Sequence, residues 1–224
     1  MKDNLTQKIK DDFDRLASCD VEGWNHNSHY HSFLLQQLPN KGRVVLDIGC
    51  GTGEFSRLLA RRFQKVIAID LSPNALEIAR QRSKSYPNID YRVANILEWK
   101  IPTEKFDAIV SIATLHHVSE EKLLPKLTLG LKPGGKLVVL DLLKLKTIQD
   151  SWSDLIAVPL NRWFLLKNRP PKPSPEAVAA MQEHLLTDEF LTLSGVKQIY
   201  PNQLRGAKIR KHLFWRYSVV WEKP

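Results

Sequence analysis

The stretch VVLDIGCGTGEF at residues 44–55 is the part of this chain that decides its fold. It begins as a continuous apolar run with two β-branched valines, which is typical of a short buried strand. Glycines at 49, 51 and 53 then interrupt the run, and apolar residues recur at helical spacing from Glu54 onward. The stretch therefore predicts a strand, a glycine loop and a helix. Because glycine has no Cβ, such a loop lets a ligand approach bare backbone at the start of a helix.

The segments that follow alternate between strand and helix character. We expect further strands at 66–70, 88–93, 106–112 and 136–141, and helices at 72–84 and 120–131. This order, with short connections, is typical of a parallel sheet covered by helices on both faces. Near the C-terminus, AKIRKHLFW and RYSVVWEK predict an antiparallel hairpin that completes the sheet. The chain is therefore expected to form an α/β domain.

Helical segments are also expected outside this core pattern. Residues 2–16 form an amphipathic pattern, and a second buried helical face ends at Pro39. The segment 142–175 is rich in apolar and aromatic residues and ends in RPPKPSP, which predicts a helical insertion and a proline-rich loop before a further helix. The apolar stripe of the first helix consists of Leu5, Ile9, Phe13 and Leu16.

Length and composition favour one globular domain. The 224 residues suffice for one sizeable core, and 43% hydrophobic with 25% charged residues is ordinary for a soluble protein. The charged N-terminal sequence lacks the apolar core of a signal peptide, and no apolar run approaches the roughly 18 residues of a membrane span. The two cysteines, Cys19 and Cys50, suit a reduced protein without disulfides. We therefore expect a cytoplasmic protein with no membrane span.

The net charge of +9 leaves two interpretations open. It is compatible with a polyanionic partner such as RNA, or with an anionic membrane surface. More often, such a charge reflects a solvated basic face, and here the basic residues are spread along the chain with one denser stretch at 205–216. Charge alone therefore does not identify a partner.

Acidic residues near the glycine loop indicate a nucleoside ligand. Asp47 lies at the end of the first strand, and Asp70 ends the second strand. A carboxylate at that place can accept hydrogen bonds from both ribose hydroxyls, although it can also be a simple strand-end cap. The loop reads G-x-G-x-G, unlike the G-x-G-x-x-G of NAD sites, and lacks the Lys-Ser/Thr of a P-loop. A nucleoside without a phosphate fits this pattern best.

At this point the sequence resembles the class I S-adenosylmethionine-dependent methyltransferases. Five motifs match that family in order: LDIGCGTG at 46–53, IAIDLS at 67–72, VANILEW at 93–99, FDAIVSIATLHHV at 106–118 and LKPGGKLVVLD at 131–141. The resemblance covers about residues 30–141 and the terminal hairpin, and is strongest to small-molecule methyltransferases related to those of quinone biosynthesis. It implies a Rossmann-like, doubly wound, mostly parallel seven-stranded sheet with a C-terminal antiparallel hairpin and a small helical insertion.

The resemblance also implies S-adenosyl-L-methionine as the cofactor. The glycine loop would lie against the methionine part, with Asp47 near its amino group. Asp70 would bind the ribose, and Leu71 would cover the adenine. The adenine would be held by Asn95, where the family often has Asp, or by the backbone N–H of Ile96. The full set of expected cofactor-binding residues is Tyr30, Asp47, Gly49, Cys50, Gly51, Gly53, Asp70, Leu71, Asn95, Ile96, Ser111 and Ile112.

Histidines are the candidates for a base. Methyl transfer from a sulfonium mainly requires alignment and exclusion of water, and a base near neutral pH helps when the acceptor is a hydroxyl. His116 and His117 follow the fourth strand, at the edge where open α/β sheets bind ligands, and either one can instead be structural. His29 lies with His26 and His31 in a segment that can fold across the site as a lid. The candidate catalytic residues are therefore His116, His117 and His29.

Other features leave alternatives open. The histidine-rich segment can bind a metal, but no acid-acid-Asn set resembling magnesium-dependent catechol-type enzymes is evident, so we expect none. Trp152, Trp163 and Phe164 either form an apolar acceptor pocket or belong to the core. Asp141 is either a strand-end cap or a substrate contact. Cys50 is expected to be a small loop residue and not a nucleophile, because no base lies nearby in the sequence.

These patterns predict a single methyltransferase domain over residues 1–224. Within it we expect N-terminal helices or a lid at 1–40, a cofactor-binding core at 41–141, a helical insertion on the acceptor side at 142–190 and the terminal hairpin at 191–224. The expected reaction methylates a small, apolar or aromatic metabolite, on O rather than C or N, and the protein is a monomer or homodimer. An RNA (tRNA) methyltransferase and a non-catalytic S-adenosylmethionine-binding module are the alternatives. The sequence does not support an RNA methyltransferase, because the fourth strand ends in SIATLHH. Nucleic-acid enzymes that methylate amino groups have [DN]-P-P-[YFW] at this position.

Overall fold

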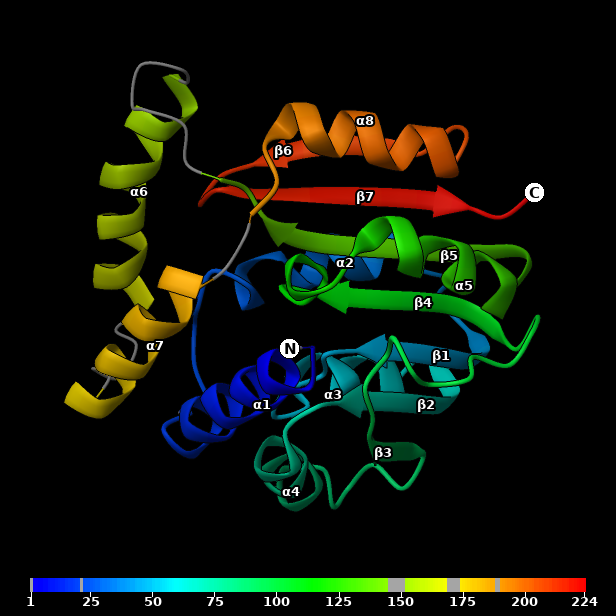
Figure 1. Cartoon of the computed structure of the whole chain (residues 1–224), viewed down its shortest axis with the longest axis horizontal. Coiled ribbons are helices and arrows are strands. Elements are labelled where there is room, and N and C mark those ends of the chain that lie inside the picture. The colour runs from blue at the N-terminus through cyan, green and yellow to red at the C-terminus, as the bar shows by residue number, and fades with distance from the viewer. Residues whose placement is uncertain (1, 21, 145–151, 169–173, 188–189) are drawn as a thin grey trace.

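Seven strands pair into one mixed sheet in the order β3-β2-β1-β4-β5-β7-β6 (Figure 1). The computed structural model describes residues 2–20, 22–144, 152–168, 174–187 and 190–224. The strands are β1 Gly42–Ile48, β2 Phe63–Asp70, β3 Ile89–Val93, β4 Phe106–Ile112, β5 Leu131–Leu142, β6 Lys208–His212 and β7 Arg216–Glu222. The first five run parallel, whereas β7 is antiparallel to β5 and β6. The predicted fold class is confirmed.

The central strands are buried on both faces, which explains their continuous apolar sequences. Leu46 of β1 lies opposite Ile67 of β2 on one side and Ile109 of β4 on the other. The chain therefore adds β2 and β3 on one side of β1 and later returns to add β4 on the other side. The carboxyl ends of β1 and β4 border the topological switch point, where open α/β sheets bind ligands.

Helices cover both faces of the sheet. Alternate residues of each central strand belong to two separate apolar clusters, one with α5 and α8 and the other with α2 and α3. α4 contacts β2 and β3, and its N-cap is Ser72, whose hydroxyl accepts the Ala75 N–H at 2.9 Å. The bounds are α2 His31–Gln37, α3 Glu54–Ala60, α4 Pro73–Arg82, α5 Glu120–Gly130 and α8 Leu193–Gln203.

Some elements differ from the prediction. β2 begins at Phe63, not at 66, and β5 begins at Leu131, not at 136. The early part of β5 runs through a Pro-Gly-Gly sequence, and its pairing with β4 is interrupted by a register shift there. α8 was not predicted within 191–224, because Gly195 and Pro201 weaken its helical pattern. Its N-cap, Thr192, accepts the Gly195 N–H at 3.2 Å.

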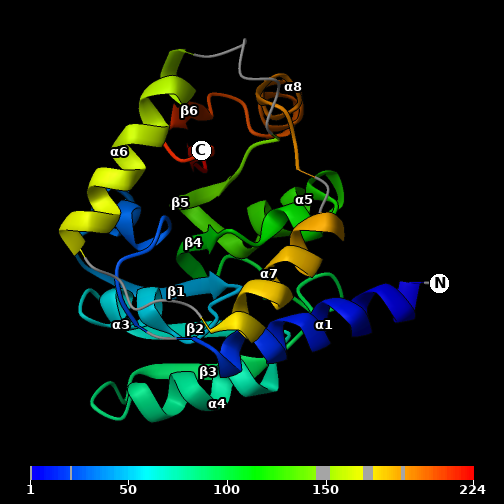
Figure 2. The same ribbon diagram turned by 90° about the vertical axis from the view of Figure 1, so that its left-hand side faces the viewer.

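Three further helices gather at the end of the sheet toward which the parallel strands point (Figures 1 and 2). They are α1 Lys2–Ser18, α6 Trp152–Asn168 and α7 Pro175–Thr187. α1 packs against α4 and α7, and the Arg15 guanidinium contacts the Glu183 carboxylate of α7 at 2.8 Å. The structure describes no helix that is long and apolar enough to cross a membrane.

Candidate active site

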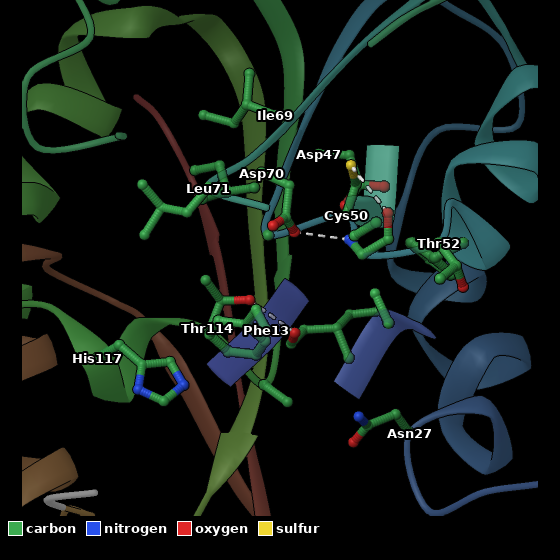
Figure 3. A pocket seen from close by; sticks show the side chains of 18 of the residues that line it. Phe13, Asn27, Asp47, Cys50, Thr52, Ile69, Asp70, Leu71, Thr114 and His117 are labelled. Atoms are coloured by element: carbon green, nitrogen blue, oxygen red, sulfur yellow. Dashed lines mark hydrogen bonds between the residues drawn. The ribbon is translucent and has the colours of Figure 1, made fainter. Parts of the chain in front are cut away.

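A cavity of about 340 Å³ opens at the carboxyl ends of β1, β2 and β4. Its lining combines this edge of the sheet with side chains of α1, such as Phe13 (Figure 3), and with one residue of α7. A concave, mostly apolar site with a few polar groups is the usual form of a small-molecule site. The sequence-predicted residues that line it are Asp47, Gly49, Cys50, Gly51, Asp70, Leu71, Asn95, Ile96, Ile112 and His117.

The glycine loop meets the cavity as bare backbone. Gly49 has a φ of +69°, and a Cβ on it would lie 2.0 Å from the Thr114 hydroxyl oxygen. A residue with a side chain would therefore be strained and would displace the segment after β4. The N–H groups of Gly49 and Cys50 donate to the Ile69 carbonyl of β2, at 2.9 and 3.1 Å. These bonds fix the loop between the ends of β1 and β2.

Asp70 connects the loop to the cavity. Its two carboxylate oxygens accept the N–H groups of Gly51 and Ser72, at 2.8 and 2.9 Å. Burial raises the pKa of this carboxyl, while the backbone N–H donors oppose the rise. Each oxygen has a second lone pair, and the side chain lines the cavity (Figure 3). This arrangement fits a ligand with adjacent hydroxyls, as a ribose has.

Asp47 is a buried acid at the end of β1. One of its oxygens accepts the Ser56 hydroxyl at 2.5 Å. Burial raises the pKa of Asp47 to about 7, although the bond from Ser56 acts in the opposite direction. A carboxyl that has lost its hydration gains most from a cation placed beside it, because an opposite charge favours its ionised form. The amino group of a methionine part would be such a cation.

The predicted adenine contacts form another part of the lining. Asn95 Oδ1 accepts the Leu97 N–H at 3.0 Å, and its Nδ2 donates to Glu98 at 3.1 Å. These bonds hold the side chain in a local turn. A contact between Asn95 and a purine would therefore use the second lone pair of Oδ1 or the second N–H of Nδ2. Leu71 and Ile96 are apolar neighbours in the lining, which suits a flat ring.

The two adjacent histidines have different positions. His117 lines the cavity, and its ring meets the Phe13 ring of α1 edge-on, with centroids 5.2 Å apart. His116 does not line the cavity: its Nδ1 lies 2.6 Å from Oδ1 of the fully buried Asp141, whose Oδ2 accepts the His116 N–H at 3.1 Å. The two imidazole centroids are 3.9 Å apart. Of the two residues, His117 is thus the one in the cavity lining, and Asp141 serves as the partner of His116.

Besides His116, four predicted site residues lie outside the cavity lining: His29, Tyr30, Gly53 and Ser111. The His29 ring packs edge-on against Phe164 at 4.8 Å, within an aromatic cluster. The Tyr30 hydroxyl donates to the Leu213 carbonyl at 2.8 Å, which turns this side chain toward the terminal hairpin. Ser111 donates to the Ile48 carbonyl at 3.2 Å, and a Cβ on Gly53 would lie 2.3 Å from the Tyr91 hydroxyl. These contacts place the four residues in the structure around the cavity and not in its lining.

Trp163 and Phe164 of the insertion are also separate from the cavity lining. Phe164 of α6 stacks parallel on Trp24, with centroids 5.5 Å apart, and Trp163 is half exposed. Of these predicted acceptor residues, the side chain of Trp152 lies outside the described residues. His31, from the histidine-rich segment, does line the cavity, and burial lowers its pKa to about 4.

Helices α1 and α7 contribute lining residues that the motifs do not identify. Ile9, Phe13 and Leu16 of α1 line the cavity, as does Met181 of α7. The α1 residues belong to the apolar stripe visible in the sequence, but a stripe does not reveal which surface it will cover. Asp20, just after α1, accepts the hydroxyl of Thr52 in the glycine loop at 2.9 Å. Within the described ranges, no group of three or more His, Cys, Asp or Glu residues is arranged to hold a metal ion.

Comparison with known proteins agrees with this site. A family model described as a methyltransferase domain matches residues 45–135. An uncharacterized methyltransferase of Mycobacterium tuberculosis is 31% identical over 207 residues, which cover 90% of this chain and 98% of the relative. A 2-phytyl-1,4-naphtoquinone methyltransferase of a Nostoc species is 32% identical over 174 residues, covering 70% of this chain and 76% of the relative.

The fold is also similar to that of solved structures. A putative S-adenosylmethionine dependent methyltransferase from Listeria monocytogenes has a TM-score of 0.62 at 19% identity, over 88% of this chain and 98% of that chain. The predicted cofactor agrees with the site, where the glycine loop, Asp70 and the buried Asp47 line one cavity. This chain therefore belongs to the S-adenosylmethionine-dependent methyltransferases, and S-adenosyl-L-methionine is its cofactor.

Proposed function

We propose that this enzyme methylates a hydroxyl oxygen of a small, apolar or aromatic metabolite, with His117 as the base. The observation that carries the proposal is the position of His117 in the lining of the cofactor cavity. Its imidazole centroid lies 5.2 Å from that of the Phe13 ring and 3.9 Å from that of the His116 ring. An imidazole is suited to accept a hydroxyl proton near neutral pH. Apolar neighbours in the lining, such as Phe13 and Val118, suit an apolar acceptor.

Methyl transfer requires little from the protein beyond positioning the two reactants. The cofactor supplies a methyl group on a positively charged sulfur, which is already an activated leaving group. The chain's residues must hold the acceptor oxygen in line with the sulfur–carbon bond and exclude water. As the oxygen–carbon bond forms and the sulfur–carbon bond breaks, the hydroxyl proton would move to the imidazole of His117. The products are the methyl ether, neutral S-adenosylhomocysteine and protonated His117.

Helices α1 and α7 would form the cover that excludes water. Phe13 and Leu16 of α1 and Met181 of α7 line the cavity from this side. Side-chain contacts at exposed positions hold the cover: Asp20 with Thr52 of the glycine loop, and Arg15 with Glu183 between α1 and α7. Such contacts are weak in water, so the cover could open for cofactor and acceptor. This assigns the lid role to α1 and the acceptor side to α7.

The named relative supports an aromatic ring in the acceptor. The 2-phytyl-1,4-naphtoquinone methyltransferase is named for a naphthoquinone that carries an apolar chain. A hydroxylated ring is compatible with both the imidazole and the apolar part of the lining. Ionisation of such a ring places negative charge on oxygen and on ring carbons, so product analysis has to identify the methylated atom.

The test is an acceptor screen with methyl-labelled S-adenosylmethionine. The purified enzyme is incubated separately with hydroxylated naphthalenes and catechols, with aliphatic alcohols and with bulk tRNA. Mass spectrometry detects methyl transfer, and nuclear magnetic resonance of the product distinguishes a methoxy carbon from a methyl on a ring carbon or nitrogen.

We expect a methoxy product from at least one aromatic acceptor. Exclusive methylation of a ring carbon or nitrogen would contradict the oxygen assignment, and methylation of tRNA alone would contradict the small-molecule assignment. Cofactor binding without transfer to any class would instead favour the non-catalytic binding module.

A further inference from the structure

Helix α6 presents a group of large apolar side chains to solvent. Val158, Trp163, Leu165 and Leu166 are 62%, 50%, 43% and 70% exposed. Among the described residues, the other exposed large apolar side chains lie on β3, α5 and α7, one or two on each. Single exposed apolar residues are ordinary, whereas a group on one helix marks an interaction surface.

The opposite side of α6 holds the helix to the protein. Asn161 Oδ1 lies 2.9 Å from Nε2 of His26, and Phe164 stacks parallel on Trp24. These two α6 residues are three positions apart and therefore share one face of the helix. The outward residues are thus presented by a helix that is anchored from behind, and Figure 2 shows α6 on the outside of the molecule.

The exposed surface of α6 is also cationic. Arg162 and Lys167 are both exposed, and the Lys167 ammonium lies 5.0 Å from the centroid of the Trp163 ring. In the sequence, residues 155–175 contain four basic residues and no Asp or Glu. Long basic side chains beside Trp and Leu are characteristic of helices that lie in a membrane interface, where apolar groups enter and charges reach the headgroups.

We propose that α6 docks on an anionic lipid surface. Trp163, Leu165 and Leu166 enter the interface, and Arg162 and Lys167 contact lipid phosphates. A membrane supplies both the apolar layer and the negative surface potential that this face matches. A second copy of the chain is a poorer occupant, because a symmetric dimer through α6 would bring two cationic faces together. The proposal does not depend on the identity of the methyl acceptor.

Docking through α6 would place the cavity side of the enzyme toward the lipid. α6 and α7 lie at the same end of the sheet (Figure 1), and Met181 of α7 lines the cavity. An acceptor dissolved in the membrane would thereby have a short path to the site.

Vesicle co-sedimentation of the full chain tests the proposal. Vesicles of phosphatidylcholine alone are compared with vesicles of equal parts phosphatidylcholine and phosphatidylglycerol, at about 0.05 M and about 0.5 M salt. The double substitution Leu165→Gln/Leu166→Gln removes the apolar contact. Leu129→Gln is the matched control, because Leu129 is 60% exposed on α5, away from this helix.

We expect the wild type to bind the anionic vesicles, more weakly at high salt, and the Leu165→Gln/Leu166→Gln variant to bind at least about tenfold more weakly. Leu129→Gln should bind as the wild type does. Arg162→Gln/Lys167→Gln should flatten the salt dependence, whereas Lys122→Gln/Lys197→Gln, which removes two exposed lysines of α5 and α8, should not. Circular dichroism confirms that each variant is folded.

Three results would overturn the proposal. The wild type could fail to bind anionic vesicles. The Leu165→Gln/Leu166→Gln variant could bind as tightly as the wild type. Light scattering could instead show a dimer that this variant dissociates without any vesicle binding, which would identify α6 as an interface between copies of the chain.

Discussion

The cavity has a wall and a cover that are built in different ways. The wall consists of the glycine loop and the ends of β1, β2 and β4, and backbone hydrogen bonds to Asp70 and Ile69 fix it. The cover consists of α1 and α7, whose side chains reach the cavity from outside the sheet. A side-chain pair at an exposed position, Asp20 with Thr52, attaches the cover to the glycine loop, and Arg15 with Glu183 joins α1 to α7.

This difference separates the part of the site that binds the cofactor from the part in which side chains can be substituted. A wall made of backbone N–H groups, the buried Asp47 and the half-buried Asp70 suits one ligand, the cofactor, because few side chains can be exchanged there without strain. A cover made of amphipathic helices accepts substitution more easily, and it lines the side from which an acceptor would enter. The chemistry of the family is therefore expected to reside in the wall and acceptor choice in the cover.

The largest expected effect concerns His117, which lies where wall and cover meet. His117→Asn should lower kcat by about 10³-fold, which corresponds to about 4 kcal/mol, because the hydroxyl proton loses its acceptor. The Kd for S-adenosylmethionine, measured by calorimetry, should stay the same because the wall is intact. His29→Asn is the control, since His29 does not line the cavity. An equal loss of kcat in both variants would contradict the assignment of His117.

The next effect concerns Asp141 behind the histidines. Asp141→Ala leaves the Nδ1 and N–H of His116 without their buried acceptor, and should lower the free energy of unfolding by about 3 kcal/mol in denaturant titration. Asp90→Ala removes partly exposed contacts with Lys65 and Arg92 and should cost less than about 1 kcal/mol. Similar losses in the two variants would show that the pair of Asp141 and His116 does not stabilise the fold.

A smaller effect distinguishes the wall from the cover directly. Asp70→Ala should raise the Kd for S-adenosylmethionine at least tenfold, which corresponds to about 1.4 kcal/mol, through loss of the ribose contact and of the loop bonds. Met181→Ala, in the cover, should raise the KM for the acceptor and change the cofactor Kd by less than about twofold. If Met181→Ala weakened cofactor binding as strongly as Asp70→Ala, the division into wall and cover would be wrong.

The smallest effect is a pH dependence at Asp47. Below about pH 7 this carboxyl is protonated in the free enzyme, because burial raises its pKa to about 7. Binding of the methionine amino group favours the ionised form, so cofactor affinity should rise severalfold from about pH 6 to about pH 7.5. Above about pH 8 it should fall, as the amine loses its own proton. Calorimetry should show no rise for Asp47→Asn, and an identical rise in both proteins would exclude Asp47 as the titrating group.

The wall could be predicted from the sequence because its determinants are local. An apolar strand, a glycine turn and an acid at the next strand end are separated by fixed spacings, and the structure brings Asp47, Gly49 and Asp70 to one cavity. The fold followed from the same periodicity. α8 escaped prediction because packing against α5 through Tyr200 overrides the weak helical tendency of a segment that contains Gly195 and Pro201.

The cover could not be predicted in the same way, because its contacts join residues distant in sequence. The stripe of Ile9 and Phe13 indicates a helix but not the surface that the helix covers. His29 is expected at the site as part of a lid segment, and Tyr30 from the family resemblance. In the structure the His29 ring packs against Phe164 and the Tyr30 hydroxyl donates to the terminal hairpin, so neither residue lines the cavity. The choice between His116 and His117 likewise depended on Asp141, a partner from another strand.

A crystal structure of the enzyme with S-adenosylhomocysteine tests the central claim most directly. The account predicts that the ribose hydroxyls bind Asp70, that the amino group lies beside Asp47 and that the sulfur faces His117 beneath α1. A ribose held by another residue, or a sulfur turned away from His117, would contradict it.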